Sequence, residues 1–299
     1  MLQTHNLSKT FGSTRAVQNL DLSVQVGQIR GLLGPNGAGK STTIRMICGV
    51  LAPTSGSIQI GGENISLNPT VAKQFIGYVP EGAPLPLELL PIEYLKHSAT
   101  MYGLYGDERM KAIGSWAERC DIENVLRKPI GSLSRGYRQR LALAAALVHN
   151  PKLIVLDEPS TGLDPEQGAS FRTLLKEVAE HAAVMYSSHH LAEVEVTCDV
   201  VSIINHGMLI HEGDFQSLYS GETSLTVEVS PHAVVEELPC ANIEFIDERW
   251  ARCTVDSLQG EQVVSKVTGA NGKVRLLHPL EESIESNYLR IIRVSEKQS

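Results

Sequence analysis

One segment, Gly34 to Thr42, constrains the fold of this chain more than any other. It is GPNGAGKST, it follows an apolar strand-like run over 28–34, and it precedes a helix-like segment that starts near residue 40. Glycines in such a loop let backbone N–H groups close around phosphate oxygens, and the start of the helix adds positive dipole character. The segment therefore predicts a phosphate-binding loop between a buried strand and a helix. Its expected nucleotide-contacting residues are Gly34, Pro35, Asn36, Gly37, Ala38, Gly39, Lys40, Ser41 and Thr42.

Two further apolar runs, 152–157 and 182–187, become polar only at their C-terminal ends. Such runs are typical of parallel strands that helices cover on both faces. Helical patterns dominate from about 85 to 150, and the helix that closes this stretch, 135–149, is rich in Ala, Leu and Arg. We therefore predict a doubly wound α/β sheet with a helical insertion, and ligands at the carboxyl ends of its strands.

Composition excludes several other classes of protein. With 299 residues and 42% hydrophobic residues, the chain can bury a large core without crosslinks. Its five cysteines are scattered and form no CxxC pair, which argues against a disulfide framework or a zinc site and favours a reducing compartment. The net charge of −8 provides no general attraction to nucleic acid. No apolar run approaches the ~18 residues of a membrane span.

The pattern changes to short alternating runs near residue 221, so we expect one domain over 1–220 and an α+β domain over 221–299. The order βαββαβ is compatible with a ferredoxin-like fold, and a last helix is expected from 279 to about 293. The second domain has no cluster of His, Cys or paired acids, which favours a structural or docking role over ligand sensing. The expected strands are 224–230, 243–247, 250–256 and 273–278, and the expected helices between them are 232–238 and 261–269.

Polar side chains that suit phosphate chemistry accompany the loop. Lys40 is expected to reach the β- and γ-phosphates of a nucleotide, and the Ser41 hydroxyl to bind Mg²⁺. The apolar run 152–157 ends in Asp157, a candidate metal ligand, and is followed by Glu158. A carboxylate facing the γ-phosphate can accept a proton from attacking water, so Glu158 is the candidate general base. The loop alone is also found in kinases, GTPases and helicases.

The segment LSRGYRQR, 133–140, starts the helix before that acidic strand. Ser134 and Gly136 would present a hydroxyl and backbone N–H groups at a helix N-terminus, although an ordinary helix cap explains the segment equally well on its own. Its place before the acidic strand resembles the LSGGQ-type signature of the ATP-binding subunits of ABC transporters. The resemblance covers roughly residues 2–215. It implies the ABC cassette, with a RecA-like parallel sheet, an antiparallel β subdomain and a helical insertion.

The resemblance also implies roles for residues outside the loop. Phe11 matches the aromatic residue that stacks on adenine, Asp164 ends a segment that resembles the D-loop, and His189 matches the switch histidine that contacts the γ-phosphate. His189 is therefore expected to be catalytic together with Glu158. The implied ligands are ATP and Mg²⁺, and hydrolysis is expected to drive closing and reopening of the assembly.

The partners implied by the resemblance are a second copy of the chain and separate transmembrane permease subunits. In a head-to-tail homodimer, Ser134, Arg135 and Gly136 of one chain act on the ATP held by the other. The chain itself would lie on the cytoplasmic face of the inner membrane through its partners. The expected permease contact is 84–94.

Two residues depart from the family pattern. Glu81 stands where the family usually has a glutamine, and it keeps the ability to accept a hydrogen bond or bind a metal while losing the ability to donate. Arg135 replaces a signature glycine, and its positive charge suits a neighbouring γ-phosphate. Both features resemble the exporter subfamily that includes gliding-motility-associated and drug- or antibiotic-resistance ATPases, which implies export.

Two other functions are weighed against a transporter. DNA-repair or ribosome-associated ABC proteins usually have two cassettes, coiled coils or basic arms, which this sequence lacks. A degenerate cassette that binds ATP only to regulate a partner is disfavoured by the presence of Lys40, Glu158 and His189.

Overall fold

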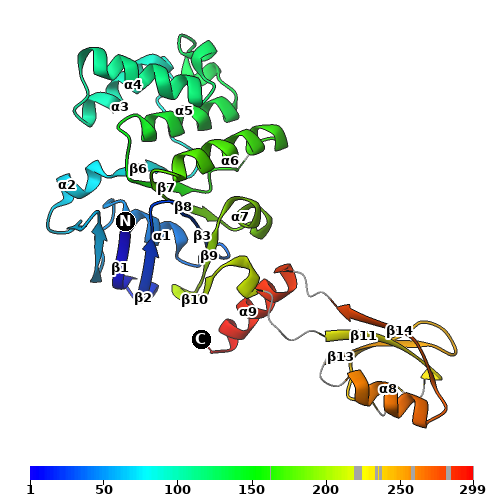
Figure 1. The fold of residues 1–299 in the computed structure, drawn as a ribbon. Coiled ribbons are helices and arrows are strands. Elements are labelled where there is room, and N and C mark those ends of the chain that lie inside the picture. The colour runs from blue at the N-terminus through cyan, green and yellow to red at the C-terminus, as the bar shows by residue number, and fades with distance from the viewer. Residues whose placement is uncertain are drawn as a thin grey trace. The chain divides into compact units, whose positions relative to one another are not determined.

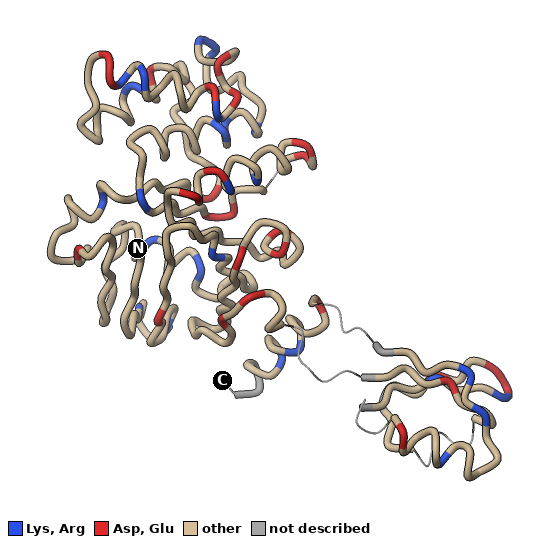
Figure 2. The backbone as a smooth tube through the Cα atoms, viewed as in Figure 1, with Lys and Arg blue, Asp and Glu red and all other residues tan. Residues whose placement is uncertain are grey.

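The computed structural model describes residues 1–161, 163–218, 224–232, 235, 238–256, 260–280 and 284–298. The chain divides into two compact units, Met1–Asp214 with Ser295–Ser299, and Phe215–Val294. The domain boundary expected at 220 lies outside the described residues. Figure 2 shows acidic and basic residues interspersed in both units. Within the described part of the chain, no helix is both long enough and apolar enough to span a bilayer.

The first unit contains the predicted parallel sheet (Figure 1). Its strand order is β10-β9-β3-β8-β7-β6, and all neighbouring strands are parallel except the β9–β10 pair. The runs predicted at 28–34, 152–157 and 182–187 form β3, β7 and β8, which are completely buried. The strands are β3 (Ile29–Leu33), β6 (Ile76–Val79), β7 (Leu153–Asp157), β8 (Ala183–Ser188), β9 (Val200–Asn205) and β10 (Met208–Gly213).

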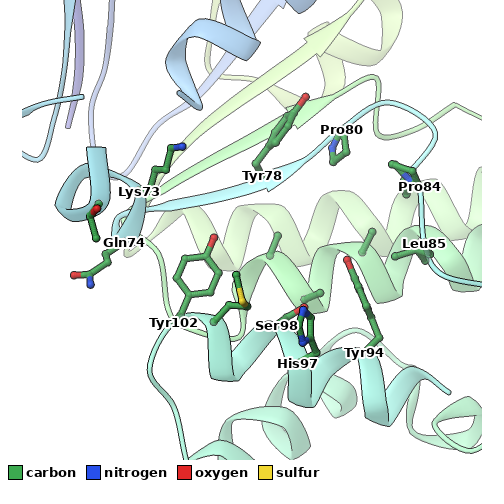
Figure 3. A pocket seen from close by; sticks show the side chains of 16 residues that line it. Lys73, Gln74, Tyr78, Pro80, Pro84, Leu85, Tyr94, His97, Ser98 and Tyr102 are labelled. Carbon is green, nitrogen blue, oxygen red and sulfur yellow. The ribbon is translucent and has the colours of Figure 1, made fainter. Parts of the chain in front are cut away.

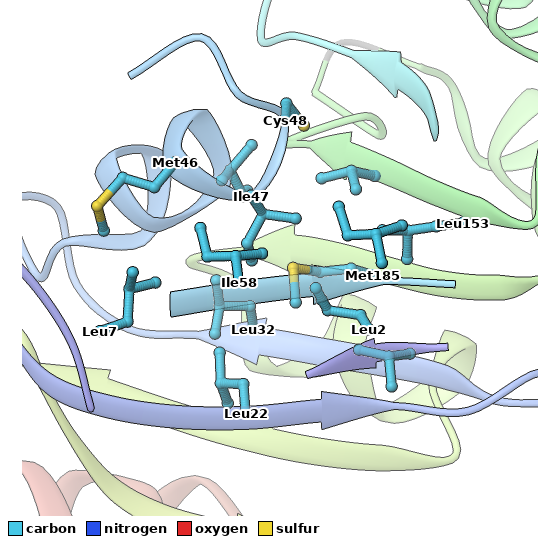
Figure 4. Close-up of a cluster of buried hydrophobic side chains, with 14 of the residues drawn as sticks. Leu2, Leu7, Leu22, Leu32, Met46, Ile47, Cys48, Ile58, Leu153 and Met185 are labelled. Atoms are coloured by element: carbon cyan, nitrogen blue, oxygen red, sulfur yellow. The ribbon is translucent and has the colours of Figure 1, made fainter. Parts of the chain in front are cut away.

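A second, antiparallel sheet of the same unit has the order β2-β1-β4-β5. Its apolar side chains meet those of the parallel sheet and of helix α1 in one buried cluster, in which Leu2, Ile58, Leu32 and Met185 are fully buried (Figure 4). Burial of each such side chain contributes about 1.5–3 kcal/mol, so this cluster, which includes Ile44, Met46 and Ile47, holds α1 against both sheets. The strands are β1 (Leu2–Phe11), β2 (Thr14–Val24), β4 (Ser55–Ile60) and β5 (Glu63–Asn64).

Helices occupy the segments between the parallel strands, and the predicted helical insertion consists of α3, α4 and α5 (Figure 1). Ser134 caps α5 by accepting a hydrogen bond from the Tyr137 N–H, and Asp164 caps α6 by accepting one from Gln167. The helices are α1 (Lys40–Ile47), α2 (Pro69–Gln74), α3 (Pro91–Met101), α4 (Gly106–Arg119), α5 (Arg135–Leu147), α6 (Pro165–Ala179) and α7 (Leu191–Thr197). Short 3₁₀ turns lie at Glu123–Val125, Ile130–Ser132 and Phe215–Leu218.

The second unit contains a four-stranded antiparallel sheet with the order β12-β13-β11-β14. This strand order matches a ferredoxin-like fold, with α8 packed on the sheet. Much of the helix expected at 232–238 lies outside the described residues. The elements are β11 (Ser224–Ser230), β12 (Ala241–Phe245), β13 (Ala251–Asp256), α8 (Gly260–Gly269) and β14 (Lys273–Leu280). The last helix, α9 (Ile284–Gln298), begins in this unit, and its residues from Ser295 on belong to the first.

Several boundaries in this unit differ by one to five residues from the sequence prediction, and two of the differences have a clear physical cause. The strand predicted to end at 247 ends at Phe245, because Asp247 Oδ1 accepts hydrogen bonds from the Arg249 and Trp250 N–H groups and forms a turn. The last helix was predicted from Pro279, which instead pairs with Leu225 in β14. Proline is tolerated there because β14 is an edge strand, where the missing N–H leaves the ladder intact.

Candidate active site

The phosphate-binding loop joins the carboxyl end of β3 to α1. Gly37 and Gly39 have φ values of 82° and 105°, a conformation that side chains disfavour. A Cβ at Gly34 would lie 2.2 Å from the Ile204 carbonyl oxygen, and one at Gly39 would lie 2.5 Å from that of Ala16. The loop therefore requires glycine at positions where its backbone bends tightly against neighbouring strands.

Lys40 is the first residue of α1, and its side chain is buried. Its Nζ donates hydrogen bonds to the carbonyl oxygens of Gly34 and Pro35, at 2.7 and 3.2 Å, and lies 3.8 Å from Glu158 Oε1. Burial lowers the pKa of Lys40, whereas the charges of Glu158, Asp157 and Glu81 oppose that shift. These carboxylates thus favour the ammonium form that phosphate binding needs.

The acidic pair comes from the end of β7. Asp157 is 3% exposed and accepts a hydrogen bond of 2.6 Å from Ser187 Oγ on the neighbouring strand β8. Glu158 adopts a left-handed conformation with φ of 51°, and its N–H is 3.2 Å from both the carbonyl oxygen and Oγ of Ser187. A residue of this type in that conformation is strained, and such strain occurs mostly at functional sites. Ser187 therefore positions both acids.

The carboxylate of Glu158 lies between Lys40 and a histidine. Its Oε2 is 2.9 Å from His189 Nδ1, and its Oε1 faces the Lys40 ammonium. The Glu158 side chain is 9% exposed and the His189 side chain 34% exposed, so the histidine is the member of the pair that water reaches. A carboxylate held in this way at the edge of a cavity can accept a proton.

These side chains surround a cavity of about 270 Å³ beside the loop. Backbone N–H groups at a helix N-terminus, an ammonium group and hydroxyl groups suit phosphate oxygens, while the carboxylates suit a hard cation. Nevertheless, no group of three His, Cys, Asp or Glu side chains poised for a metal exists in the described residues. The residues that line the cavity are Ala16, Asn36, Gly37, Ala38, Gly39, Lys40, Ser41, Thr42, Glu81, Glu158, Thr161 and His189.

Five predicted site residues do not line this cavity and do not belong to the phosphate loop or the acidic pair: Phe11, Ser134, Arg135, Gly136 and Asp164. Phe11, at the end of β1, is 49% exposed, and Lys9 Nζ lies 5.2 Å from its ring centroid. Arg135 lines a different cavity, of about 430 Å³. Gly136 and Asp164 both lie next to Gln167. The Gln167 N–H donates to Asp164 Oδ1 at 2.8 Å, and a Cβ at Gly136 would lie 2.1 Å from Gln167 Oε1.

Apart from Phe11, the predicted site residues thus form two groups within one chain. One group surrounds the phosphate loop, and the other joins the start of α5 to the start of α6. The sequence analysis did not identify Ala16, Thr161 or Ser187 as site residues. The signal for Ser187 was present, since a polar pair of serines at the end of an apolar strand precedes His189.

Comparison with known proteins identifies relatives of the chain. A family model described as ABC transporter matches residues 17–161. A second model, described as AAA domain, putative AbiEii toxin, Type IV TA system, matches residues 128–195. The linearmycin resistance ATP-binding protein LnrL of Bacillus subtilis is 38% identical over 276 residues, which cover 89% of each chain. The bacitracin transport ATP-binding protein BcrA of Bacillus licheniformis is 38% identical over 220 residues, or 73% of this chain and 71% of the relative.

Solved structures show the same fold. The ATP-binding subunit of an ABC transporter matches with a TM-score of 0.68 and 29% identity, covering 73% of this chain and 91% of that one. A dimeric ATP-binding cassette in a post-hydrolysis state, bound to ADP and Pi, matches with a TM-score of 0.66 and 25% identity. This second match covers 72% of this chain and 98% of that one.

Proposed function

This chain belongs to the ATP-binding proteins of the ABC transporter family, which are ATPases, and we propose that two copies hydrolyse ATP between them to energise a separate membrane-spanning exporter. The main support is the convergence of Lys40, Glu158 and His189 on one cavity beside the phosphate loop. Each of these three side chains has a distinct task in phosphoryl transfer.

Hydrolysis needs a base, a means of stabilising charge and a means of positioning the nucleotide. Glu158 accepts the proton of the attacking water, and His189 holds its carboxylate through the 2.9 Å contact. Lys40 stabilises the charge that develops on the transferred phosphoryl group. The half-exposed ring of Phe11 offers an apolar face for adenine.

The oxygen-rich side of the cavity fits Mg²⁺. The Ser41 hydroxyl and the Glu81 carboxylate line it, and Asp157 is held at the end of β7 by Ser187. These are the oxygen ligands that Mg²⁺ prefers. A bound Mg²⁺ supplies positive charge that neutralises the phosphate oxygens.

The separation of the site residues into two groups supports a head-to-tail pair of chains. Ser134 and Arg135 are exposed at the start of α5, next to the buried Gly136, and Asp164 lies exposed at the start of α6; none of them lines the cavity that Lys40 lines. In the pair, the start of α5 of one chain completes the phosphate site of the other. The N–H groups and dipole of that helix start, together with Arg135, attract the γ-phosphate.

A cavity of about 690 Å³ in the first unit is our proposed contact for the membrane permease. It lies between β6 and α3, and Figure 3 shows Tyr94 and His97 of α3, with Tyr102 directly after it, across from the strand β6 that carries Tyr78. Met101, at its rim, is 73% exposed. An exposed apolar surface of this kind suits a helical segment of a partner. The stretch 84–94 contributes Pro84, Leu85 and Tyr94 to this cavity.

The cargo that we propose is an antibiotic-like amphiphile moved outward. The support is that the two relatives are named for linearmycin resistance and bacitracin transport. Attachment through the permease would place the chain on the cytoplasmic face of the inner membrane.

The dimer part of the proposal can be tested by light scattering on Glu158→Gln, which is expected to retain ATP. With Mg-ATP its mass should double, and with Mg-ADP it should not. Adding Ser134→Arg should prevent the doubling, whereas Ser115→Arg, at an exposed serine on α4, should leave it unchanged. A mass that stays monomeric in Mg-ATP contradicts the proposed pair.

The docking part can be tested with two matched substitutions of exposed methionines. Met101→Glu places a charge at the rim of the 690 Å³ cavity, whereas Met110→Glu places one on α4 outside it. In cells that contain the permease, Met101→Glu should shift the chain out of the membrane fraction while ATP hydrolysis by the purified chain persists. Equal membrane association of both variants contradicts this contact.

A further inference from the structure

A hydrogen-bonded network of four side chains lies behind the Glu158–His189 pair. Its centre is Glu193, in the first turn of α7, which follows directly after the end of β8 (Figure 1). Glu193 Oε2 accepts hydrogen bonds from Ser160 Oγ at 2.5 Å and from Ser188 Oγ at 2.9 Å. Tyr186, which is 1% exposed, donates from its hydroxyl to Ser160 Oγ at 2.9 Å.

The hydrogens of this network can be assigned to one consistent arrangement. Each serine hydroxyl has a single hydrogen, and both hydrogens point to Glu193. The oxygen of Ser160 is then free to accept from Tyr186, and that of Ser188 accepts from the His190 N–H at 3.0 Å. The chain of hydrogen bonds therefore ends at the Glu193 carboxylate, which accepts from both serines and donates to none.

The network fixes the two segments from which the catalytic pair projects. Ser188 and the His190 N–H flank His189 on both sides, and Ser160 follows Glu158 by two residues. Neither Glu193 nor its serine partners line the nucleotide cavity. We infer that Glu193 is a positioning residue, which holds the Glu158 segment and the His189 segment at the separation that gives their 2.9 Å contact.

The inference rests on the proposed function of Glu158 and His189. A small displacement of a reacting group lowers a rate strongly, whereas binding of the nucleotide depends on the phosphate loop, which the network does not touch. Loss of Glu193 should therefore lower kcat with little change in KM for ATP. Glutamine retains an oxygen at the same place and can accept both hydroxyl hydrogens, so Glu193→Gln should largely preserve the rate.

The test compares Glu193→Ala with Glu193→Gln and with Glu195→Ala, a control at an exposed acid on the same helix. Glu193→Ala is expected to lower kcat about tenfold or more, with KM changed by less than about twofold. Glu193→Gln and Glu195→Ala are expected to stay within about twofold of the parent chain. In a chain that already carries His189→Ala, Glu193→Ala should lower kcat by less than about twofold further, because both changes act on the Glu158–His189 contact. Ser160→Ala removes one of the two hydrogen bonds to Glu193 and should give a kcat between those of the parent chain and Glu193→Ala.

Two results would overturn the inference. One is a kcat for Glu193→Ala equal to that of Glu195→Ala. The other is a loss in kcat from Glu193→Ala that is as large in the His189→Ala chain as in the parent chain. The imidazole NMR signals of His189 give a readout that does not need turnover. They should shift in Glu193→Ala and remain in place in Glu193→Gln, and unchanged signals in both contradict the inference. A different result tests the proposed function: if the Glu158→Gln variant hydrolyses ATP at the parental rate, the proposed function itself is contradicted.

Discussion

His149 gives a prediction about the pH dependence of stability that can be worked from its surroundings. Its Nε2 lies 3.1 Å from the Ile76 carbonyl oxygen, and its ring stacks on Tyr102 with centroids 3.4 Å apart. A carbonyl only accepts, so Nε2 carries the hydrogen, and the buried Nδ1 has no hydrogen-bond partner among the described residues. Protonation would place an unpartnered N–H there. Burial accordingly lowers the pKa of His149 to about 4, which the bond to Ile76 opposes only in part.

The sign of the effect follows from proton counting. Between pH 4 and about 6.5 the unfolded chain binds more protons at His149 than the folded chain, so stability rises with pH in this window. The contribution is fully present above about pH 6.5 and is lost as the pH falls toward 4. From pH 7 to pH 5 the full shift corresponds to about 1.8 kcal/mol. The ring is half-buried, and water screening reduces this to about 1 kcal/mol.

The assay is urea unfolding at pH 7 and pH 5, followed by the fluorescence of Trp116. Trp250→Phe removes the other tryptophan of the chain, so the signal reports on the first unit alone. Between the two pH values, the free energy of unfolding should fall by about 1 kcal/mol more with His149 than with His149→Phe. Other titrating groups cancel in this difference. An equal loss in both chains, or a larger loss in the phenylalanine variant, refutes the reasoning.

Three further perturbations have defined outcomes. Gly31→Ala should destabilise the chain by about 2–3 kcal/mol in thermal unfolding, because its Cβ would lie 2.2 Å from Val194 Cγ1, whereas Gly114→Ala, with open space on α4, should stabilise it by about 0.5–1 kcal/mol. Ser187→Ala removes the hydrogen bond to Asp157 Oδ1 and should raise the Mg²⁺ concentration for half-maximal ATP hydrolysis by about tenfold; an unchanged Mg²⁺ dependence contradicts this role. Lys40→Ala should weaken binding of a fluorescent ATP analogue by about tenfold or more in equilibrium titration, and unchanged affinity would exclude Lys40 from the phosphate site.

The architecture of the first unit could be predicted because its signals are local in the sequence. The apolar runs that form β3, β7 and β8 are uninterrupted, and the loop between β3 and α1 has a fixed pattern of glycines. The order of the four strands and of α8 in the second unit was likewise visible as alternating runs. The predicted start of α9 was wrong because proline usually marks the boundary of a helix or strand. Pro279 can lie within β14 only because β14 is at the edge of its sheet.

The support behind the site could not be predicted, because it depends on which strands become neighbours. β7 and β8 are far apart in the sequence, yet their pairing brings Ser187 within hydrogen-bond distance of Asp157 and of the N–H of Glu158. The role that we infer for Glu193 likewise requires the end of β8 to lie beside the loop that contains Ser160. A single sequence shows each of these residues only as a polar side chain near a strand end.

The central claim is that Glu158 activates the water that hydrolyses ATP bound at the phosphate loop. The most direct measurement is the steady-state rate of phosphate release by the purified chain, by Glu158→Gln and by Glu118→Gln, a control at an exposed acid on α4, with ATP affinity measured alongside. The account predicts that Glu158→Gln binds ATP with parental affinity and loses at least about a hundredfold in rate, while Glu118→Gln keeps the parental rate. Phosphate release by Glu158→Gln at the parental rate would contradict it.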